Sequence, residues 1–252
     1  MKIGVFINNK GGVGKTTSSQ NVAAALAKFS GSRVLVIDLD PQGSLTRCFG
    51  IEKSTLKKLS SDFIMGSSLE ECSINVNGVT VIPANKKLSD QIDTIKGSSY
   101  FPFNLKKALQ KVSNQFDFVI IDCQPSLKEG LTKLALIACT HYFVPLEAKF
   151  LSYEGLADLL EYTNEVQEIT DNAVLAGVFA TKFNPKIKKK IARVTMEQLK
   201  NQLDSYLMTS YIRDNTKLDE AQSYGQNIFD YDPKSNGAKD YYSLTAEILE
   251  RL

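Results

Sequence analysis

Short apolar runs alternate along the chain with longer segments in which apolar residues recur every three or four positions. The short runs are rich in Val, Ile and Phe, and they predict strands at Ile3–Ile7, Arg33–Asp38, Val79–Pro83, Phe116–Asp122, His141–Leu146, Val174–Thr181 and Ser205–Ile212. The longer segments predict helices at Lys15–Phe29, Phe103–Asn114, Leu127–Ala138, Ser152–Thr170, Ile187–Leu203 and Ala238–Leu252. Runs such as VLVID and FVIID are apolar at consecutive positions, which is typical of strands covered on both faces.

This alternation of strands and helices predicts an α/β fold, with a mostly parallel twisted sheet and helices on both of its faces. Sheets of this kind bind ligands beyond the carboxyl ends of their strands, where the strand order switches. The sequence contains no internal repeat and no low-complexity linker, so we expect a single domain over residues 1–252.

The composition excludes several classes of protein. A chain of 252 residues that is 43% hydrophobic can bury a sizeable core and is not disordered. Its 30 Lys and Arg against 28 Asp and Glu leave a net charge of +2, so a nucleic-acid site must be a local cluster. Four widely spaced cysteines argue against a zinc site or a disulfide scaffold. No apolar run approaches the roughly 20 residues of a membrane span, so we expect a soluble, cytoplasmic protein without a membrane partner.

A glycine-rich segment between the first strand and the first helix carries the strongest chemical signal. It reads Lys10-Gly11-Gly12-Val13-Gly14-Lys15-Thr16-Thr17. Its glycines let backbone N–H groups wrap phosphate oxygens, and the start of the helix adds the positive end of its dipole. In the pattern G-x-x-x-x-G-K-[ST] the lysine, here Lys15, reaches the β- and γ-phosphates, and the next hydroxyl, here Thr16, ligates Mg²⁺. The segment therefore predicts an ATP and Mg²⁺ site, although Asn9 stands where the first glycine would be.

Three aspartates lie at the ends of two predicted strands. Asp38 and Asp40 follow the run VLVI, and Asp122 ends the run FVIID. A single aspartate at such a place often caps the following helix. Three of them beside a phosphate-binding loop favour a metal–nucleotide site, with Asp122 in the Walker B position that holds Mg²⁺ directly or through water.

The loop resembles the deviant Walker A box of the ParA/MinD family of dimerising ATPases, which has the second lysine, Lys10. In that family the first lysine reaches across the dimer to the partner's nucleotide, so the resemblance implies that role for Lys10. The segment Asp38-Leu39-Asp40-Pro41-Gln42 is similar to the family's next motif. The resemblance implies that Asp40 positions the attacking water, that Asp38 supports the metal site, and that Lys10, Lys15 and Asp40 are catalytic.

The resemblance extends over nearly the whole chain. Asp122-Cys123-Gln124-Pro125-Ser126 is similar to the family's D-C-P-P-S but departs from it at Gln124. Lys149 stands where the family usually has an acidic residue, and it is a candidate for a second trans lysine, although a solvent-exposed lysine is the more common situation. By resemblance, Thr181, Ile212, Arg213 and Asp214 are expected near the adenine base.

A basic cluster occupies the predicted helix after the last long strand. Six basic residues and no acid lie between Lys182 and Arg193. Such runs are usually solvated helix faces, but in ParA proteins this helix carries DNA contacts, and another basic residue precedes the L-x-E-A motif. The resemblance therefore implies contacts with the DNA backbone, independent of base sequence, from Lys186, Lys189, Lys190, Arg193 and Lys217.

Together these features imply a partition ATPase. Its ATP-bound homodimer would bind non-specific nucleoid DNA, and a ParB-like protein or another cargo adaptor would release it by stimulating hydrolysis. The cargo stays open among a plasmid, a chromosome and a large assembly such as carboxysomes.

Four alternatives remain from related or different classes. A MinD-like membrane-cycling ATPase needs a basic amphipathic tail, whereas this chain ends in Ile248–Leu252 within a helix that we expect to be packed. A reductase like the nitrogenase iron protein needs paired cysteines around a cluster, and a tyrosine autokinase needs a terminal tyrosine cluster; neither pattern is a good match. A nucleotide-gated scaffold that barely hydrolyses ATP would tolerate Asp40→Ala.

Overall fold

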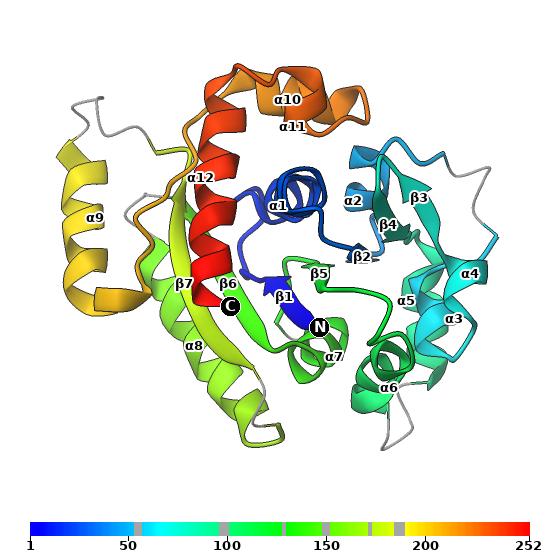
Figure 1. Cartoon of the computed structure of the whole chain (residues 1–252). Coiled ribbons are helices and arrows are strands. Elements are labelled where there is room, and N and C mark those ends of the chain that lie inside the picture. The colour runs from blue at the N-terminus through cyan, green and yellow to red at the C-terminus, as the bar shows by residue number, and fades with distance from the viewer. Residues whose placement is uncertain (53–56, 96–100, 128–129, 148–151, 171–172, 184–189) are drawn as a thin grey trace.

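A computed structural model describes residues 1–52, 57–95, 101–127, 130–147, 152–170, 173–183 and 190–252. A sheet with the strand order β3-β4-β2-β5-β1-β6-β7 forms its centre (Figure 1). The strands are β1 (Lys2–Phe6), β2 (Val34–Leu39), β3 (Ile74–Val76), β4 (Val79–Ile82), β5 (Phe118–Cys123), β6 (His141–Glu147) and β7 (Val174–Thr181). All neighbours pair in parallel except β3, which joins the edge antiparallel to β4. The predicted fold class is confirmed.

Helices cover both faces of the sheet (Figure 1). One face carries α1 (Lys15–Ser30), α2 (Ser44–Cys48), α10 (Thr216–Ser223), α11 (Ile228–Tyr231) and α12 (Asn236–Arg251). The other carries α3 (Ser60–Ile64), α4 (Leu69–Cys72), α5 (Lys87–Ile95), α6 (Asn104–Lys111), α7 (Gly130–Ala138), α8 (Ser152–Gln167) and α9 (Lys190–Leu203). Because apolar residues on both faces are covered, every residue of β2 is buried, as its consecutive apolar pattern predicts.

The order of the strands decides where a ligand can bind. β1 lies between β5 and β6, so the chain moves to opposite sides of β1 as it builds the sheet. In register, Asp122 of β5 lies opposite both Phe6 of β1 and Asp38 of β2. The carboxyl ends of these three strands therefore meet at one edge, at the kind of switch point where open α/β sheets bind ligands.

The predicted strand Ser205–Ile212 is wrong. The segment begins within a 3₁₀ turn at Asp204–Tyr206, and it then meets β7 only at two isolated bridges, Val178 with Leu207 and Thr181 with Ile212. Between these bridges, Glu247 of α12 accepts hydrogen bonds from the backbone N–H groups of Thr209 (2.9 Å) and Ser210 (2.8 Å). A side chain therefore takes the donors that a continuous ladder would need.

Strand β3 was missed because it has only three residues, and the polar Asn75 separates its two apolar ones. It forms a hairpin with β4 through Asn77 and Gly78, whose φ angles are 50° and 85°. Asn-Gly with positive φ at both positions is the preferred turn of two-residue hairpins, so this dipeptide was the available signal. In the part of the chain that the structure describes, no helix is long and apolar enough to cross a membrane.

Candidate nucleotide-binding site

The glycine-rich loop joins the end of β1 to the start of α1. Gly12 and Gly14 have φ angles of 72° and 93°, a region that favours glycine, and Gly14 is the N-cap of α1. The first turn of α1 contains no acidic residue, so nothing in that turn neutralises the positive end of the helix dipole. The loop and the helix start together form a site for an anion such as a phosphate chain.

Lys15 is held inside this loop. Its Nζ donates a hydrogen bond of 2.9 Å to the carbonyl oxygen of Lys10, and the residue is only 6% exposed. Burial lowers the pKa of the Lys15 ammonium below its ordinary value, while the nearby carboxylate of Asp122 opposes the shift. Lys10, in contrast, is exposed.

The two asparagines before the glycines fix the loop against its neighbours. Asn8 accepts a hydrogen bond from the backbone N–H of Lys10 (2.9 Å) and donates one to the carbonyl oxygen of Pro145 in β6 (2.8 Å). Asn9 lies against α8, where a Cβ added to Gly155 would come within 3.0 Å of its Oδ1. The residue that replaces the first glycine of the pattern is therefore part of a close contact between loop and helix.

Asp122 connects the strand end to the loop helix. Its Oδ2 accepts from the Thr16 hydroxyl (2.8 Å), and its Oδ1 accepts from the Ser19 hydroxyl (2.9 Å). The two hydroxyls lie one turn apart on α1, so one carboxylate accepts hydrogen bonds from two residues on the same face of the helix. Burial, followed by the charge of Asp38, raises the pKa of Asp122 to about 7.

Asp38 and Asp40 have different surroundings. Asp38 accepts from the Thr46 N–H (2.9 Å), the Thr46 hydroxyl (2.7 Å) and the Asp40 N–H (3.0 Å), and burial raises its pKa to about 6. Asp40 lies on the cavity wall, where its Oδ1 accepts from the Gln42 N–H (2.8 Å). The structure thus places Asp38 behind the site, where it holds the backbone of Asp40, and of these two residues Asp40 is the one that faces the cavity.

A cavity of about 380 Å³ lies over the loop. Its wall consists of Gly11, Gly12, Gly14, Lys15, Thr16, Thr17, Asp40, Ser44, Cys123, Pro125, Lys182, Asp219 and Gln222. Sequence reasoning did not assign Lys182, Asp219 or Gln222 to this site. Gln222 of α10 donates to the Thr17 hydroxyl at 3.0 Å. No spacing in the sequence indicates this contact, because it joins residues 205 positions apart.

The residues expected near the base lie beside or away from this wall. Thr181 donates to the carbonyl oxygen of Val13 (2.9 Å) and so supports the loop from β7. Ile212 is buried and donates its N–H to Ala180. Arg213 pairs with Asp240 of α12, with Nη2 and Oδ1 2.5 Å apart. None of these three residues, nor Asp214, is among the lining residues of the cavity.

The predicted basic contacts are only partly described. Lys149, Lys186 and Lys189 lie outside the described residues. Lys190 and Arg193 belong to α9, which the structure describes as a helix but not at those side chains. Lys217 is described: it lies on α10 and forms an ion pair with Glu220, with 2.6 Å between Nζ and Oε2.

Known proteins share this architecture. Residues 1–176 match the family described as AAA domain. The chain is 35% identical over 252 residues to the sporulation initiation inhibitor protein Soj of Bacillus subtilis, covering 98% of each chain. It is 34% identical over 250 residues to the chromosome-partitioning ATPase Soj of Treponema pallidum, covering 98% of this chain and 96% of that protein. The chain belongs to the ParA/Soj family.

The structure of this ParA/Soj family member is also similar to a solved structure. Cobyrinic acid a,c-diamide synthase from Mycobacterium smegmatis, crystallised with an ATP analogue and magnesium, superposes with a TM-score of 0.85 at 28% identity, covering 99% of this chain and 95% of that one. The predicted resemblance to the ParA/MinD group is thus confirmed, and the roles of individual residues stay predictions.

Proposed function

We propose that this chain is a partitioning ATPase whose ATP-bound dimer holds DNA until a cargo-bound partner stimulates hydrolysis. The placement of the two loop lysines is the observation that carries the proposal. Lys15 is buried against the carbonyl oxygen of Lys10 and faces the chain's own cavity, whereas the Lys10 side chain is exposed. One lysine is therefore available for the chain's own nucleotide and the other for a second subunit.

The residues around the cavity fit ATP and Mg²⁺. The loop N–H groups and Lys15 would bind the phosphates, and the Thr16 hydroxyl on the cavity wall would be a hard oxygen ligand of the metal. Asp122, which lies behind the wall and accepts from Thr16, would hold the metal through Thr16 or a water. Among the described residues no group of three or more His, Cys, Asp or Glu could hold a metal ion. That agrees with Mg²⁺, which usually binds through one or two protein oxygens plus substrate phosphates. Bound Mg²⁺ would offset the negative charge of the phosphates.

For hydrolysis, the residues of the chain have separate roles in this proposal. Asp40 would orient the attacking water from the cavity wall, and Asp38 would position Asp40 through its backbone N–H. Lys15, and Lys10 from the partner subunit, would offset the charge that develops on the transferring phosphoryl group. Activity would then depend on dimerisation, because one of these charges comes from the second subunit.

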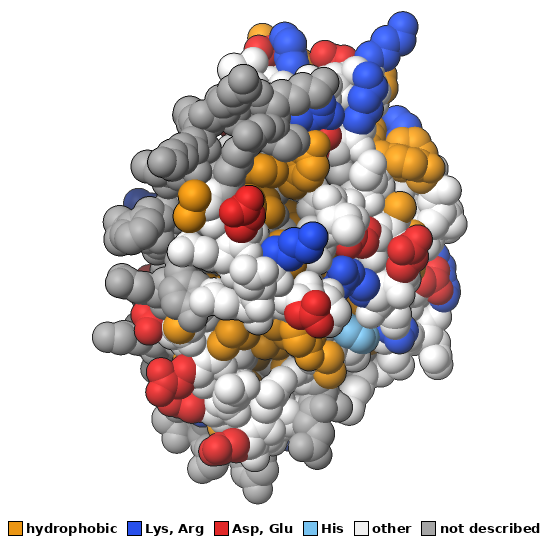
Figure 2. Space-filling model, turned by 90° about the vertical axis from the view of Figure 1, so that its left-hand side faces the viewer, with side chains coloured by type: hydrophobic (Ala, Val, Ile, Leu, Met, Phe, Trp, Pro, Cys, Tyr) orange, Lys and Arg blue, Asp and Glu red, His pale blue; other side chains and the backbone are white. Residues whose placement is uncertain are grey.

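DNA binding is proposed for the side of the molecule that carries α9 and α10. Figure 2 shows that described Lys and Arg side chains lie at the upper edge and near the middle of its face, among Asp and Glu, whereas the lowest part of the face shows Asp and Glu. Lys217 is about half exposed, and its partner Glu220 is the group that a DNA phosphate would displace. Such contacts would weaken steeply with salt and would ignore base sequence.

The test uses the full chain with ATP and Mg²⁺. Molar mass by light scattering, phosphate release, and anisotropy of a labelled random duplex would be measured with ATP, with ADP and without nucleotide. We expect an ATP-dependent dimer that binds the duplex at least about tenfold more tightly than the ADP form at 100 mM salt. If ATP produced neither a dimer nor tighter DNA binding, the proposal would fail.

Lys10→Ala separates the trans role from nucleotide binding. We expect Lys10→Ala to bind ATP nearly as tightly as the parent chain but to hydrolyse it about 10²-fold more slowly. Lys107→Ala, which removes an exposed lysine on α6, is the control of matched charge. Liposome sedimentation is included as a separate arm, since ATP-dependent membrane binding would favour the MinD-like alternative. The cargo, whether a plasmid, a chromosome or a protein assembly, would then be sought through its adaptor.

A further inference from the structure

Asn8 lies where the chain leaves β1 and enters the glycine-rich loop. Its side chain is buried, with 4% exposed, and both ends of its amide group are used. The Oδ1 atom accepts from the N–H of Lys10 (2.9 Å), and the Nδ2 group donates to the carbonyl oxygen of Pro145 (2.8 Å). Because loss of this side chain would leave a donor and an acceptor without their partner, its amide group is important for the shape of the loop.

The contact with Pro145 ties the loop to β6 beyond the end of the β1–β6 ladder. Ile7, just after β1, still donates its backbone N–H to the carbonyl oxygen of Phe143 (3.0 Å). Farther along β6, the Pro145 carbonyl oxygen accepts from the side chain of Asn8 instead of from a backbone N–H. The backbone can therefore turn into the loop while the carbonyl of a buried residue in an inner strand keeps a partner.

The backbone of Lys10 is held at both of its polar groups. Its N–H donates to Asn8, and its carbonyl oxygen accepts from the Nζ of Lys15 (2.9 Å). An asparagine that binds the N–H two residues later forms an Asx turn, which fixes the backbone between the two residues. Since the backbone sets the direction in which a side chain leaves it, these contacts fix where the exposed Lys10 side chain projects.

We propose that Asn8 is a positioning residue for Lys10, which it anchors to β6 so that the Lys10 ammonium reaches the nucleotide of a second subunit. Lys10 acts across the dimer in the proposed function, on which this role of Asn8 rests. Asn8 is not among the lining residues of the nucleotide cavity, so its effect on the reaction passes through Lys10. The anchor matters because a misplacement of about 1 Å can lower a rate by about 10²-fold.

Two variants of Asn8 separate positioning from nucleotide binding. Asn8→Ala removes both contacts and should slow phosphate release at saturating ATP about tenfold, while the affinity for a fluorescent nucleotide changes less than about threefold. Asn8→Ser keeps an acceptor two residues before Lys10 but has no amide group for Pro145. It should therefore recover part of the lost rate.

A double-mutant cycle with Lys10→Ala tests whether Asn8 acts through Lys10. Once Lys10→Ala has removed the ammonium, a positioning residue has nothing left to position, so adding Asn8→Ala should cost less than about a further twofold. If Asn8 supported the loop independently of Lys10, the two losses would multiply, to about 10³-fold in the double variant.

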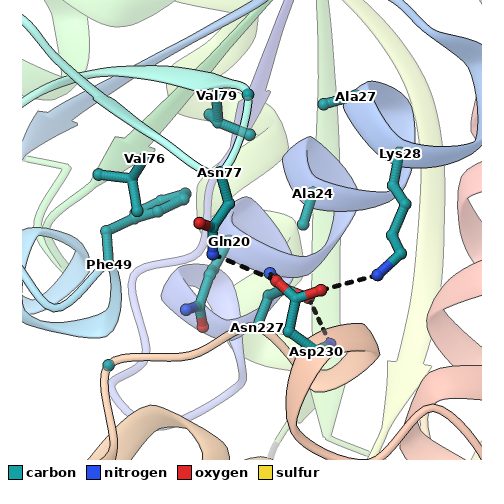
Figure 3. A pocket seen from close by; sticks show the side chains of 12 residues that line it. Gln20, Ala24, Ala27, Lys28, Phe49, Val76, Asn77, Val79, Asn227 and Asp230 are labelled. Atoms are coloured by element: carbon teal, nitrogen blue, oxygen red, sulfur yellow. Dashed lines mark hydrogen bonds and ion pairs between the residues drawn. The ribbon is translucent and has the colours of Figure 1, made fainter.

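Asn227 is the matched control. It lies at a second cavity of about 380 Å³, with walls from α1, the β3–β4 hairpin and the segment from Gly225 to α11 (Figure 3). Its side chain is 9% exposed, and its Oδ1 accepts from the N–H groups of Phe229 (3.0 Å) and Asp230 (3.1 Å). The two cavities share no lining residue, so Asn227→Ala should destabilise the fold as Asn8→Ala does but change hydrolysis less than about twofold.

The possible failures are distinct. A Lys10→Ala chain that hydrolyses ATP as fast as the parent chain would overturn the role of Lys10, and the role of Asn8 with it. If Lys10→Ala lost activity but Asn8→Ala kept its full rate, or added its full loss in the double variant, only the role of Asn8 would be overturned. Equal losses of hydrolysis in Asn8→Ala and Asn227→Ala would overturn that role as well.

Discussion

Two cavities of the same size lie along one helix, yet their linings differ. At the start of α1, backbone N–H groups and Lys15 surround about 380 Å³ and present donors. Farther along α1, a space of about 380 Å³ lies between apolar side chains and small residues, and its charges are paired. The difference lies in the helix itself, because only its first turn has free N–H groups. Anion binding therefore belongs to the helix start, and side chains alone decide what binds along its flank.

The largest contrast is expected between the two lysines of α1 that border these cavities. Lys15→Ala removes the buried ammonium that the glycine-rich loop holds at the phosphate site, so ATP hydrolysis should fall on the order of 10³-fold. Lys28→Ala should change hydrolysis less than about twofold, since its ammonium is paired with Asp230 beside the other cavity. Phosphate release at saturating ATP measures both. Equal losses would show that the two cavities are not separate.

The next effect concerns the Asp40 carboxylate, which borders the nucleotide cavity. Asp40→Asn keeps the size of a side chain on the nucleotide wall but removes its charge, so hydrolysis should fall about 10²-fold while ATP binding is retained. Fluorescent-nucleotide titration and phosphate release separate the two steps. Nearly full turnover in Asp40→Asn would contradict the role of Asp40, whereas a parent chain that barely hydrolyses ATP and an Asp40→Asn chain with unchanged function would favour the scaffold alternative.

Glycine substitutions test how tightly the second cavity is closed. Gly225 and Gly31 have nearly the same φ, 65° and 64°, but an added Cβ meets the Gly50 backbone at 2.5 Å in the first case and nothing within 4 Å in the second. Gly31→Ala should lower the free energy of unfolding by about 1 kcal/mol, through backbone strain alone. Gly225→Ala should cost about 3 kcal/mol, because overpacking adds to the same strain. Urea unfolding would contradict this reading if both losses were equal.

The smallest effect is the pH dependence of the Lys28–Asp230 pair. Burial raises the pKa of Asp230, but hydrogen bonds from Lys28 and Asn227 outweigh it and hold the pKa below the ordinary value of 3.8. Because the folded-state pKa is the lower one, the carboxylate stabilises the fold above pH 3.8, and this contribution is lost as the pH falls through the folded-state value. Asp230→Asn should therefore cost up to about 1 kcal/mol at pH 7 and less at pH 3. Unfolding at the two pH values measures the difference, and a loss that grows toward low pH would contradict it.

Much of the nucleotide site could be predicted because its parts are local in sequence. The glycines of the loop, Lys15 and Thr16 follow one another directly, and the aspartates end apolar strands that only a covered parallel sheet accommodates. The hydrogen bond between Thr16 and Asp122 then follows from the fold class. Thr16 lies at the start of the helix that follows β1, and Asp122 lies near the end of β5, the strand paired with β1.

Contacts that depend on packing between distant segments could not be predicted. Asp38 and Asp40 are two residues apart and look alike in sequence, but hydrogen bonds from Thr46 and from the Asp40 N–H hold Asp38 behind the cavity. Gln222 reaches Thr17 because α10 packs beside α1. Glu247 of α12 accepts the hydrogen bonds of Thr209 and Ser210, 38 and 37 positions earlier in the chain, and so interrupts the expected strand at residues 205–212.

The sequence by itself determined the fold class, the phosphate-binding loop and the family resemblance, since each rests on periodicity or on adjacent residues. The tertiary structure decided whether Asp38 or Asp40 faces the cavity and where the residues expected near the adenine base lie. It also decided that a second cavity exists. The physical reason is that hydrogen bonds and cavities depend on distances between side chains in space. A glutamine reads as a polar residue of a helix in the sequence, and only its surroundings make Gln20 a buried acceptor without a donor.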